Sequence, residues 1–223
     1  MDKTEAIVLK YINYTDSSII CYLLTRNFGK QTYMVRGIRG RNSKTKINLL
    51  QPMSILNVDV KHKPKANIHT LQEFSLAEFY KTIPYDIAKS SIALFIAEVV
   101  NKTLKDGEED SNLFDFVKQY ILELDTLTDN YNNLHIIFLI RLTSFLGFYP
   151  NIDDNIYSGS EINKTLINIT EIVLNTDEIL PELKELNSKN RNELLDLLLE
   201  YYNIHLQTNI NIKSLDVLKA VFL

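Results

Sequence analysis

The chain has 223 residues, a length that suits one large domain or two small ones. Its 45% apolar content, six glycines and five prolines exclude collagen-like and low-complexity classes and indicate a globular core. The single cysteine, Cys21, excludes an internal disulfide and a cysteine-cluster metal site. We expect a cytoplasmic protein, because no secretory signal is recognised and no apolar run approaches the roughly 18–20 residues of a membrane span.

Charge is unevenly distributed along the chain. The total of 24 basic and 28 acidic side chains gives a net charge of −4, which by itself argues against a nucleic-acid partner. Residues 1–81, however, carry 13 basic and 6 acidic side chains, a net charge of +7. Residues 82–223 carry 11 basic and 22 acidic side chains, a net charge of −11. This asymmetry predicts two domains with different partners.

Short apolar stretches with turns between them fill the first 80 residues. Strands are predicted at residues 4–11, 18–26, 31–36, 53–61 and 68–73. Gly29 lies between the second and third strands, in a turn where it can adopt a positive φ. Five short strands without a long helix are typical of a small barrel, and the five-stranded OB-fold is the leading candidate. An SH3-like barrel is the alternative.

The apolar pattern becomes helical after Pro84. Helices are predicted at residues 87–104, 113–127, 132–146, 190–206 and 213–222. The stretch 151–188 is rich in Asn, Asp, Ser and Thr, and its structure is left open. The predicted fold class is therefore α+β, with an OB-fold barrel over residues 1–80 followed by an all-α domain over residues 81–223.

The sequence contains no recognisable signature of catalysis or cofactor binding. Both the Gly-x-Ser-x-Gly elbow and the phosphate-binding loop are missing. His62 and His69 lie seven residues apart, with Glu73 four further on, and without other ligands nearby we interpret them as ordinary histidines. Cys21 lies in an apolar strand and is interpreted as a small buried hydrophobe. We predict a protein that is not an enzyme and uses no metal or other cofactor.

Two clusters of positive charge stand out in the predicted barrel. The first consists of Arg36, Arg39, Arg41, Lys44 and Lys46. The second consists of Lys61, Lys63 and Lys65. Such side chains reach phosphate oxygens, and Tyr33 on the adjoining strand is a candidate to stack on a base. A solvated charged loop is the alternative, but two clusters in one basic barrel favour contact with a polyanion.

Short motifs in a fixed order resemble those of a known family. The first half contains TEAIVLK at 4–10, TRNFGK at 25–30, VRGIRGR at 35–41, LQP at 50–52 and LQE at 71–73. The second half contains FLIRL at 138–142, LGFYP at 146–150 and KSLDVL at 213–218. Each motif is short, but their order and spacing resemble RecO, a family of bacterial recombination-repair mediators, over essentially the whole chain.

The resemblance implies an N-terminal OB-fold, a helical domain and a role in DNA repair and homologous recombination. Members bind single- and double-stranded DNA, anneal complementary strands, contact single-stranded DNA-binding protein, and help load RecA together with RecR. The DNA-binding role would fall on the first basic cluster and less directly on the second. Many members carry a four-cysteine zinc module after the LGFYP motif, but residues 151–160 contain no cysteine, so zinc is not expected here.

Arg141 is an isolated positive charge on an apolar helix. It is a candidate to receive a carboxylate from the acidic tail of single-stranded DNA-binding protein, and a local ion pair is the alternative.

Two other functions fit the first basic cluster. A generic OB-fold RNA-binding protein would prefer RNA over matched DNA, and a non-catalytic adaptor for an acidic protein would show no oligonucleotide affinity at moderate salt.

Overall fold

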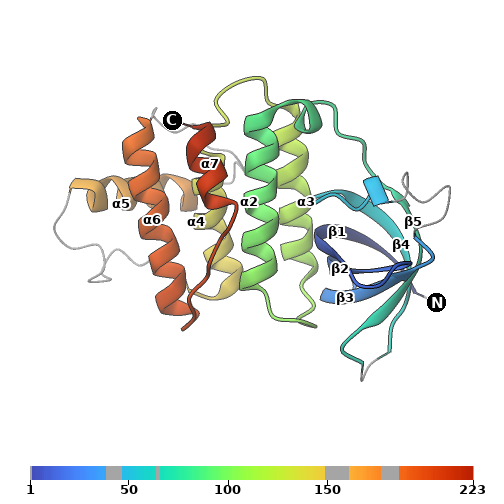
Figure 1. The fold of residues 1–223 in the computed structure, drawn as a ribbon. Helices are drawn as coiled ribbons and strands as arrows, with labels where there is room; N and C mark the ends of the chain where they lie inside the picture. Colours follow the sequence, from blue (N-terminus) through green and yellow to red (C-terminus); the bar gives the residue numbers. More distant parts are fainter. Residues whose placement is uncertain (1, 39–46, 64–65, 149–160, 177–185, 223) are drawn as a thin grey trace.

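Five strands close into a barrel at the N-terminal end of the chain (Figure 1). The computed structural model describes residues 2–38, 47–63, 66–148, 161–176 and 186–222. The strands are β1 (Asp2–Asn13), β2 (Ser18–Thr25), β3 (Gly29–Arg36), β4 (Ile55–Lys61) and β5 (His69–Leu76). All five agree in position with the predicted strands, although β1 is longer at both ends.

The barrel has the connectivity of an OB-fold. Its strand order is β1-β2-β3-β5-β4, and β4 closes the barrel on β1. β3 and β5 are parallel, whereas the other neighbours are antiparallel. Gly29 has φ +61° at the β2–β3 turn, a conformation that glycine adopts without steric cost. The OB-fold prediction is confirmed.

Both faces of the barrel wall carry buried apolar side chains. Ile19, Cys21 and Leu23 alternate along β2 and pack inside the barrel. Ile7 of β1 and Leu24 of β2 point the other way and belong to the core of the helical part. The apolar core is therefore continuous from the outer wall of the barrel into the helices.

The rest of the described chain is helical. After a short 3₁₀ turn, η1 (Ile83–Tyr85), the α-helices are α2 (Ile87–Thr103), α3 (Ser111–Thr126), α4 (Leu134–Leu146), α5 (Glu161–Leu174), α6 (Ser188–His205) and α7 (Leu215–Val221). The predicted helices are confirmed, and α5 lies in the stretch for which no element was predicted. α2 and α3 lie beside the barrel (Figure 1). Within the described ranges, no helix combines the length and apolar character needed to cross a membrane.

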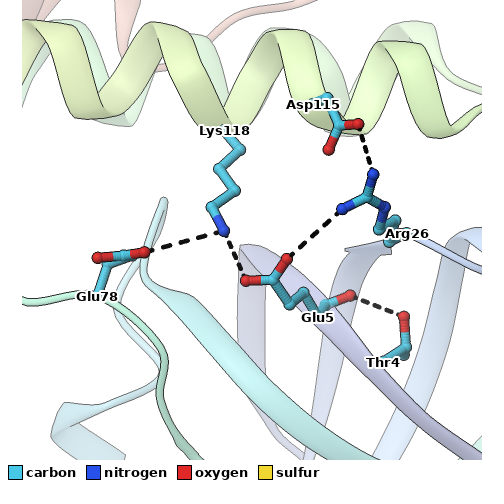
Figure 2. A network of polar contacts seen from close by, with 6 residues as sticks. All are labelled: Thr4, Glu5, Arg26, Glu78, Asp115 and Lys118. Atoms are coloured by element: carbon cyan, nitrogen blue, oxygen red, sulfur yellow. Dashed lines mark hydrogen bonds and ion pairs between the residues drawn. The ribbon is translucent and has the colours of Figure 1, made fainter.

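A network of charged side chains joins the barrel to α3 (Figure 2). Glu5 of β1 lies 2.6 Å from the Lys118 ammonium and 4.0 Å from the Arg26 guanidinium. Arg26 also lies 2.7 Å from Asp115, and Lys118 lies 3.9 Å from Glu78. Each partly exposed pair contributes at most about 1 kcal/mol. Together they fix the orientation of the barrel against α3 with alternating charges.

A lysine from the barrel caps the C-terminal end of α2. Lys30 Nζ donates to the carbonyl oxygens of Asn101 at 2.9 Å and Leu104 at 2.6 Å, and pairs with Asp106 at 3.0 Å. The backbone N–H of Gly107 donates to the Lys30 carbonyl at 2.9 Å. The last turn of a helix leaves carbonyl groups without partners inside the helix, and a cation there is favourable. The β2–β3 hairpin is therefore attached to the helical part.

The segment between the barrel and α2 is held by one buried carboxylate. Asp125 of α3 accepts hydrogen bonds from the backbone N–H groups of Lys81 at 2.7 Å, Thr82 at 2.9 Å and Ile83 at 2.9 Å. Burial raises the pKa of Asp125, but these hydrogen bonds outweigh burial and hold the pKa below its usual value. The buried Lys89 ammonium donates to the Thr82 hydroxyl at 2.6 Å. The connection is consequently rigid.

Candidate nucleic-acid interface

One side of the barrel, formed by β1, β2 and β3, combines apolar, aromatic and basic side chains. Since side chains alternate along a strand, the residues between the inward-facing ones point away from the barrel interior. They are Lys10 and Ile12 of β1, Ile20 and Tyr22 of β2, and Thr32, Met34 and Arg36 of β3. We call this set the outer face.

The pairing register aligns these residues in rows across the strands. Lys10 pairs with Tyr22, which pairs with Thr32. A second row runs across all five strands and consists of Ile12, Ile20, Met34, Thr70 and Lys61. Ile12 is 37% exposed at one end of this row, and Lys61 is exposed at the other. Ile20, in the middle of the row, is only 7% exposed, so the row offers apolar contact at Ile12 and one cation at Lys61. A cation beside an apolar surface suits a nucleic-acid strand, whose phosphates meet the cation.

The structure describes four of the predicted basic and aromatic residues and leaves five outside its described ranges. Arg36 is exposed at the end of β3, and Lys61 and Lys63 are exposed at the end of β4. Arg39, Arg41, Lys44, Lys46 and Lys65 lie outside the described residues. The segment that contains the first four begins directly after Ile38, whose backbone N–H donates to the Ser17 carbonyl at 3.2 Å. Ile38, the last described residue before this segment, therefore lies beside the β1–β2 loop.

The predicted role of Tyr33 is wrong. Its ring is 0% exposed and packs inside the barrel, with the His69 ring 5.6 Å away. Burial raises the pKa of its phenol to about 12. A buried ring presents no face to a base, so Tyr33 stabilises the barrel instead.

Exposed aromatic groups do occur at this side of the barrel, at residues that were not predicted from the sequence. Tyr14 in the β1–β2 loop is 59% exposed, whereas Tyr22 in the outer face is only partly exposed and packs against the core of the helical part. Lys10 is exposed next to Tyr22 in the same row. Once Cys21 is taken as an inward residue, alternation along the strand places Tyr22 outward, so the sequence did contain this signal.

The loop after β4 is positioned by a stack of aromatic rings. The His62 ring stacks on Phe28 at 4.6 Å and on His69 at 4.1 Å. His69 Nδ1 accepts from the backbone N–H of Lys63 at 3.1 Å, and its Nε2 lies 3.0 Å from Gln31 Oε1. Burial, with His62 next, lowers the pKa of His69, so the neutral ring that accepts from Lys63 is favoured. The two histidines thus fix the position of the Lys63 backbone in the second cluster.

Several acidic residues of the barrel line a cleft that includes no residue of β2 or β3. A cleft of about 560 Å³ between β1, β4 and β5 is lined by residues that include Glu5, Asp59 and Glu73. Asp59 and Glu73 are paired in register. Lys3 also lines the cleft and lies 4.0 Å from Asp59, but three carboxylates outnumber this one cation, so the cleft suits phosphate less well than the outer face.

Arg141 lies in α4 and is partly buried. Its Nη2 donates to the carbonyl oxygen of Thr176 at 3.2 Å, so the side chain takes part in a contact within the chain.

Among the described residues, no cluster of three or more His, Cys, Asp or Glu is arranged to hold a metal ion. Cys21 is buried, and burial raises the pKa of its thiol to about 12. This agrees with the prediction that Cys21 is a small buried hydrophobic residue.

These features define an OB-fold protein with a basic and partly apolar outer face, joined to an acidic helical part. Residues 1–80 match the family profile "Recombination protein O N terminal", and residues 84–174 match "Recombination protein O C terminal". The chain belongs to the RecO family of DNA repair proteins. It is 33% identical to the "DNA repair protein RecO" of Flavobacterium psychrophilum, over 99% of this chain and 98% of that protein. The proteins of the same name from Bacteroides fragilis and Phocaeicola vulgatus are 31% and 30% identical, over 100% of this chain and 99% of each of them.

Proposed function

We propose that the protein is a mediator of DNA repair and homologous recombination that binds single- and double-stranded DNA and anneals complementary strands. The observation that carries the proposal is the outer face, where exposed cations border an apolar and aromatic surface of an OB-fold in a RecO-family chain. The DNA-binding residues are Arg36, Arg39, Arg41, Lys44, Lys46, Lys61, Lys63 and Lys65. To these we add Lys10, Tyr14 and Tyr22.

Annealing in this proposal needs no covalent chemistry and no cofactor, so the protein is not an enzyme. Two complementary strands repel each other through their phosphates. A basic surface that neutralises both strands lowers this barrier and releases condensed counterions. Contacts to the backbone suffice, because sequence-specific contacts would restrict the strands that can be paired. The outer face supports this mechanism, since its charged residues are flexible Lys and Arg side chains.

The acidic part of the chain is proposed to serve protein partners. We divide the chain into a DNA-binding domain, residues 1–80, and a protein-interaction domain, residues 81–223, whose net charges differ in sign. In the cell we place the protein in the cytoplasm, associated with the nucleoid. There it would act with RecR to load RecA onto strands that are coated by single-stranded DNA-binding protein.

Arg141 is the proposed contact for the acidic tail of single-stranded DNA-binding protein. We expect Arg141→Ala to reduce retention of the chain on immobilised tail peptide, because the variant cannot form a guanidinium–carboxylate pair. A pull-down with wild type and variant measures the difference. Equal retention of the two proteins would show that Arg141 has a structural role only, to which its contact with Thr176 belongs.

Replacing Arg36, Arg39 and Arg41 by Ala tests the DNA-binding proposal. We expect the triple variant to bind single-stranded DNA at least about tenfold more weakly. The dependence of log affinity on log salt should become shallower by roughly 0.7 for each phosphate that the variant no longer neutralises. Fluorescence anisotropy with a labelled oligonucleotide at several salt concentrations measures both quantities.

The matched control replaces Lys105, Lys189 and Lys213 by Ala, which removes the same charge from exposed positions of the helical part. We expect this control to bind DNA as wild type does. Unchanged affinity and salt dependence in the arginine variant would contradict the assignment. A tighter complex with matched RNA than with DNA would favour the RNA-binding alternative.

A further inference from the structure

Large apolar side chains gather on the solvent side of the connection between the barrel and α2. Phe79 is 78% exposed, Tyr85 86% and Ile87 76%, and these are the three most exposed large apolar residues in the described part of the chain. Leu94 lies two turns after Ile87 on α2 and is 42% exposed. Contiguous apolar surface of this kind marks interaction sites in folded proteins.

The same residues border two adjoining hollows. One, of about 470 Å³, is lined by residues that include Pro52, Leu76 and Phe79, and a second, of about 260 Å³, is lined by residues that include Tyr85 and Ile87. Leu94 lines both. We call this continuous surface the linker groove. It lies at the junction of barrel and helices and includes none of the outer-face residues.

The backbone beneath the linker groove is fixed by hydrogen bonds. Asp125 binds three successive backbone N–H groups of the connection, and the Ser90 hydroxyl donates to the Ile83 carbonyl at 2.5 Å. The Tyr80 hydroxyl donates to the Met53 carbonyl at 2.5 Å, which ties the connection to the barrel. The exposed rings are therefore presented on a preorganised backbone, which reduces the entropy cost when a partner binds.

Among the described residues, the charged ones that line the linker groove are Glu78 and Asp86, and both are acidic. Glu78 has a side chain 43% exposed, and its ion pair with Lys118 is 3.9 Å long. Burial raises the pKa of Asp86, but hydrogen bonds from the Lys89 N–H and the Tyr131 hydroxyl outweigh burial and lower the pKa, so the carboxylate stays charged. Two carboxylates beside an apolar surface disfavour DNA and acidic peptides, and they favour a cation.

We propose that the linker groove binds a short segment of a partner protein that carries bulky apolar residues flanked by Lys or Arg. The apolar side chains would fill the hollows beside Phe79 and Leu94, and the cations would meet Glu78 and Asp86. A helical segment with apolar residues three and four positions apart has the required shape. This site is separate from the DNA-binding surface and does not depend on it.

The probe for this site is a synthetic amphipathic peptide of about 14 residues, with Leu and Phe on one face and Lys on the flanks. One comparison peptide has Glu in place of Lys, and another has the same residues in scrambled order. We expect saturable binding of the Lys peptide alone, measured by fluorescence anisotropy. Binding should weaken at least about tenfold in the double variant Phe79→Ser and Leu94→Ser. Glu78→Gln should weaken it less and reduce its dependence on salt.

The control variant is Ile172→Ser with Ile204→Ser, which removes exposed apolar residues from α5 and α6. It should bind the Lys peptide as wild type does, and all variants should keep wild-type DNA affinity. If Phe79→Ser with Leu94→Ser fails to fold, Tyr85→Ser with Ile87→Ser changes positions that are almost fully exposed. The proposal is wrong if the Lys peptide does not bind, if the Glu peptide binds equally well, or if the groove variants bind normally. It is also wrong if light scattering shows a dimer that the groove variants convert to a monomer.

Discussion

Asp125→Ala should destabilise the protein by about 3–5 kcal/mol, a large part of the stability of a typical domain. The substitution removes the acceptor of three backbone N–H groups at Lys81, Thr82 and Ile83 and leaves these donors, of which the first two are partly buried and the third is buried, without this partner. It also removes the Oδ1 atom that accepts from the Thr82 hydroxyl at 3.2 Å, and this hydroxyl in turn accepts from the buried Lys89 ammonium. Urea unfolding followed by circular dichroism measures the change in the free energy of unfolding.

Asp129→Ala is the matched control for this prediction, because Asp129 is exposed and lies four residues further along the chain. It should change stability by no more than about 0.5 kcal/mol. Asp125→Asn keeps one acceptor oxygen, and its free energy of unfolding should lie between those of Asp125→Ala and Asp129→Ala. A free energy of unfolding for Asp125→Ala within about 1 kcal/mol of the control would contradict the role assigned to this carboxylate.

Acid should destabilise the protein through His135 in α4. The side chain is 1% exposed, its ring stacks at 5.8 Å on Phe222, and its Nδ1 has no hydrogen-bond partner among the described residues. Burial, and then the charge of Arg191, lowers its pKa to about 3. Below pH 6.5 the unfolded chain takes up a proton at this position and the folded chain does not. Stability is therefore intact above pH 6.5 and falls as the pH decreases towards 3.

His135→Leu tests this prediction, because leucine fills a similar volume and has no site for a proton. We expect the loss of stability between pH 7 and pH 4 to be smaller in the variant by about 3 kcal/mol. His205→Gln, which changes an exposed histidine of α6, should leave the pH dependence as in wild type. Urea midpoints at several pH values give the comparison. Equal pH dependence in His135→Leu and wild type would rule out this histidine as the group responsible.

The fold could be predicted from the sequence wherever the apolar pattern is local. The alternation at residues 55–60 and the helical spacing at residues 113–127 both correspond to elements of the structure. The helix α5 was missed although its apolar residues follow a clear helical spacing, in which Leu166, Ile169 and Val173 are buried. The polar composition of residues 151–188 as a whole was given more weight than this local pattern. Contacts between residues far apart in the sequence leave no local pattern from which they could be predicted. One example is the contact of the Lys30 ammonium with the carbonyl oxygens at the end of α2.

The candidate interface could be predicted in its charge but not in its geometry. Arg36, Lys61 and Lys63 are exposed, as the sequence indicates for side chains in charged clusters. Tyr33 was assigned to the wrong face because the strands in this part of the barrel are buried on both faces, as in β2, where seven of the eight residues are buried. The helices cover part of the outer wall of the barrel, so the apolar pattern of a strand does not show which of its faces is exposed to solvent. The outward direction of Tyr22 follows from alternation along β2, but its place beside Lys10 follows only from the register between strands.

The rate at which two complementary oligonucleotides anneal tests most directly whether the basic side of the barrel pairs DNA strands. We expect wild type, and the variant with Lys105, Lys189 and Lys213 replaced by Ala, to accelerate annealing equally at moderate salt. The variant with Arg36, Arg39 and Arg41 replaced by Ala should lose most of this acceleration, because it no longer neutralises both strands. Annealing by the arginine variant at the wild-type rate would contradict the assignment of strand pairing to this surface.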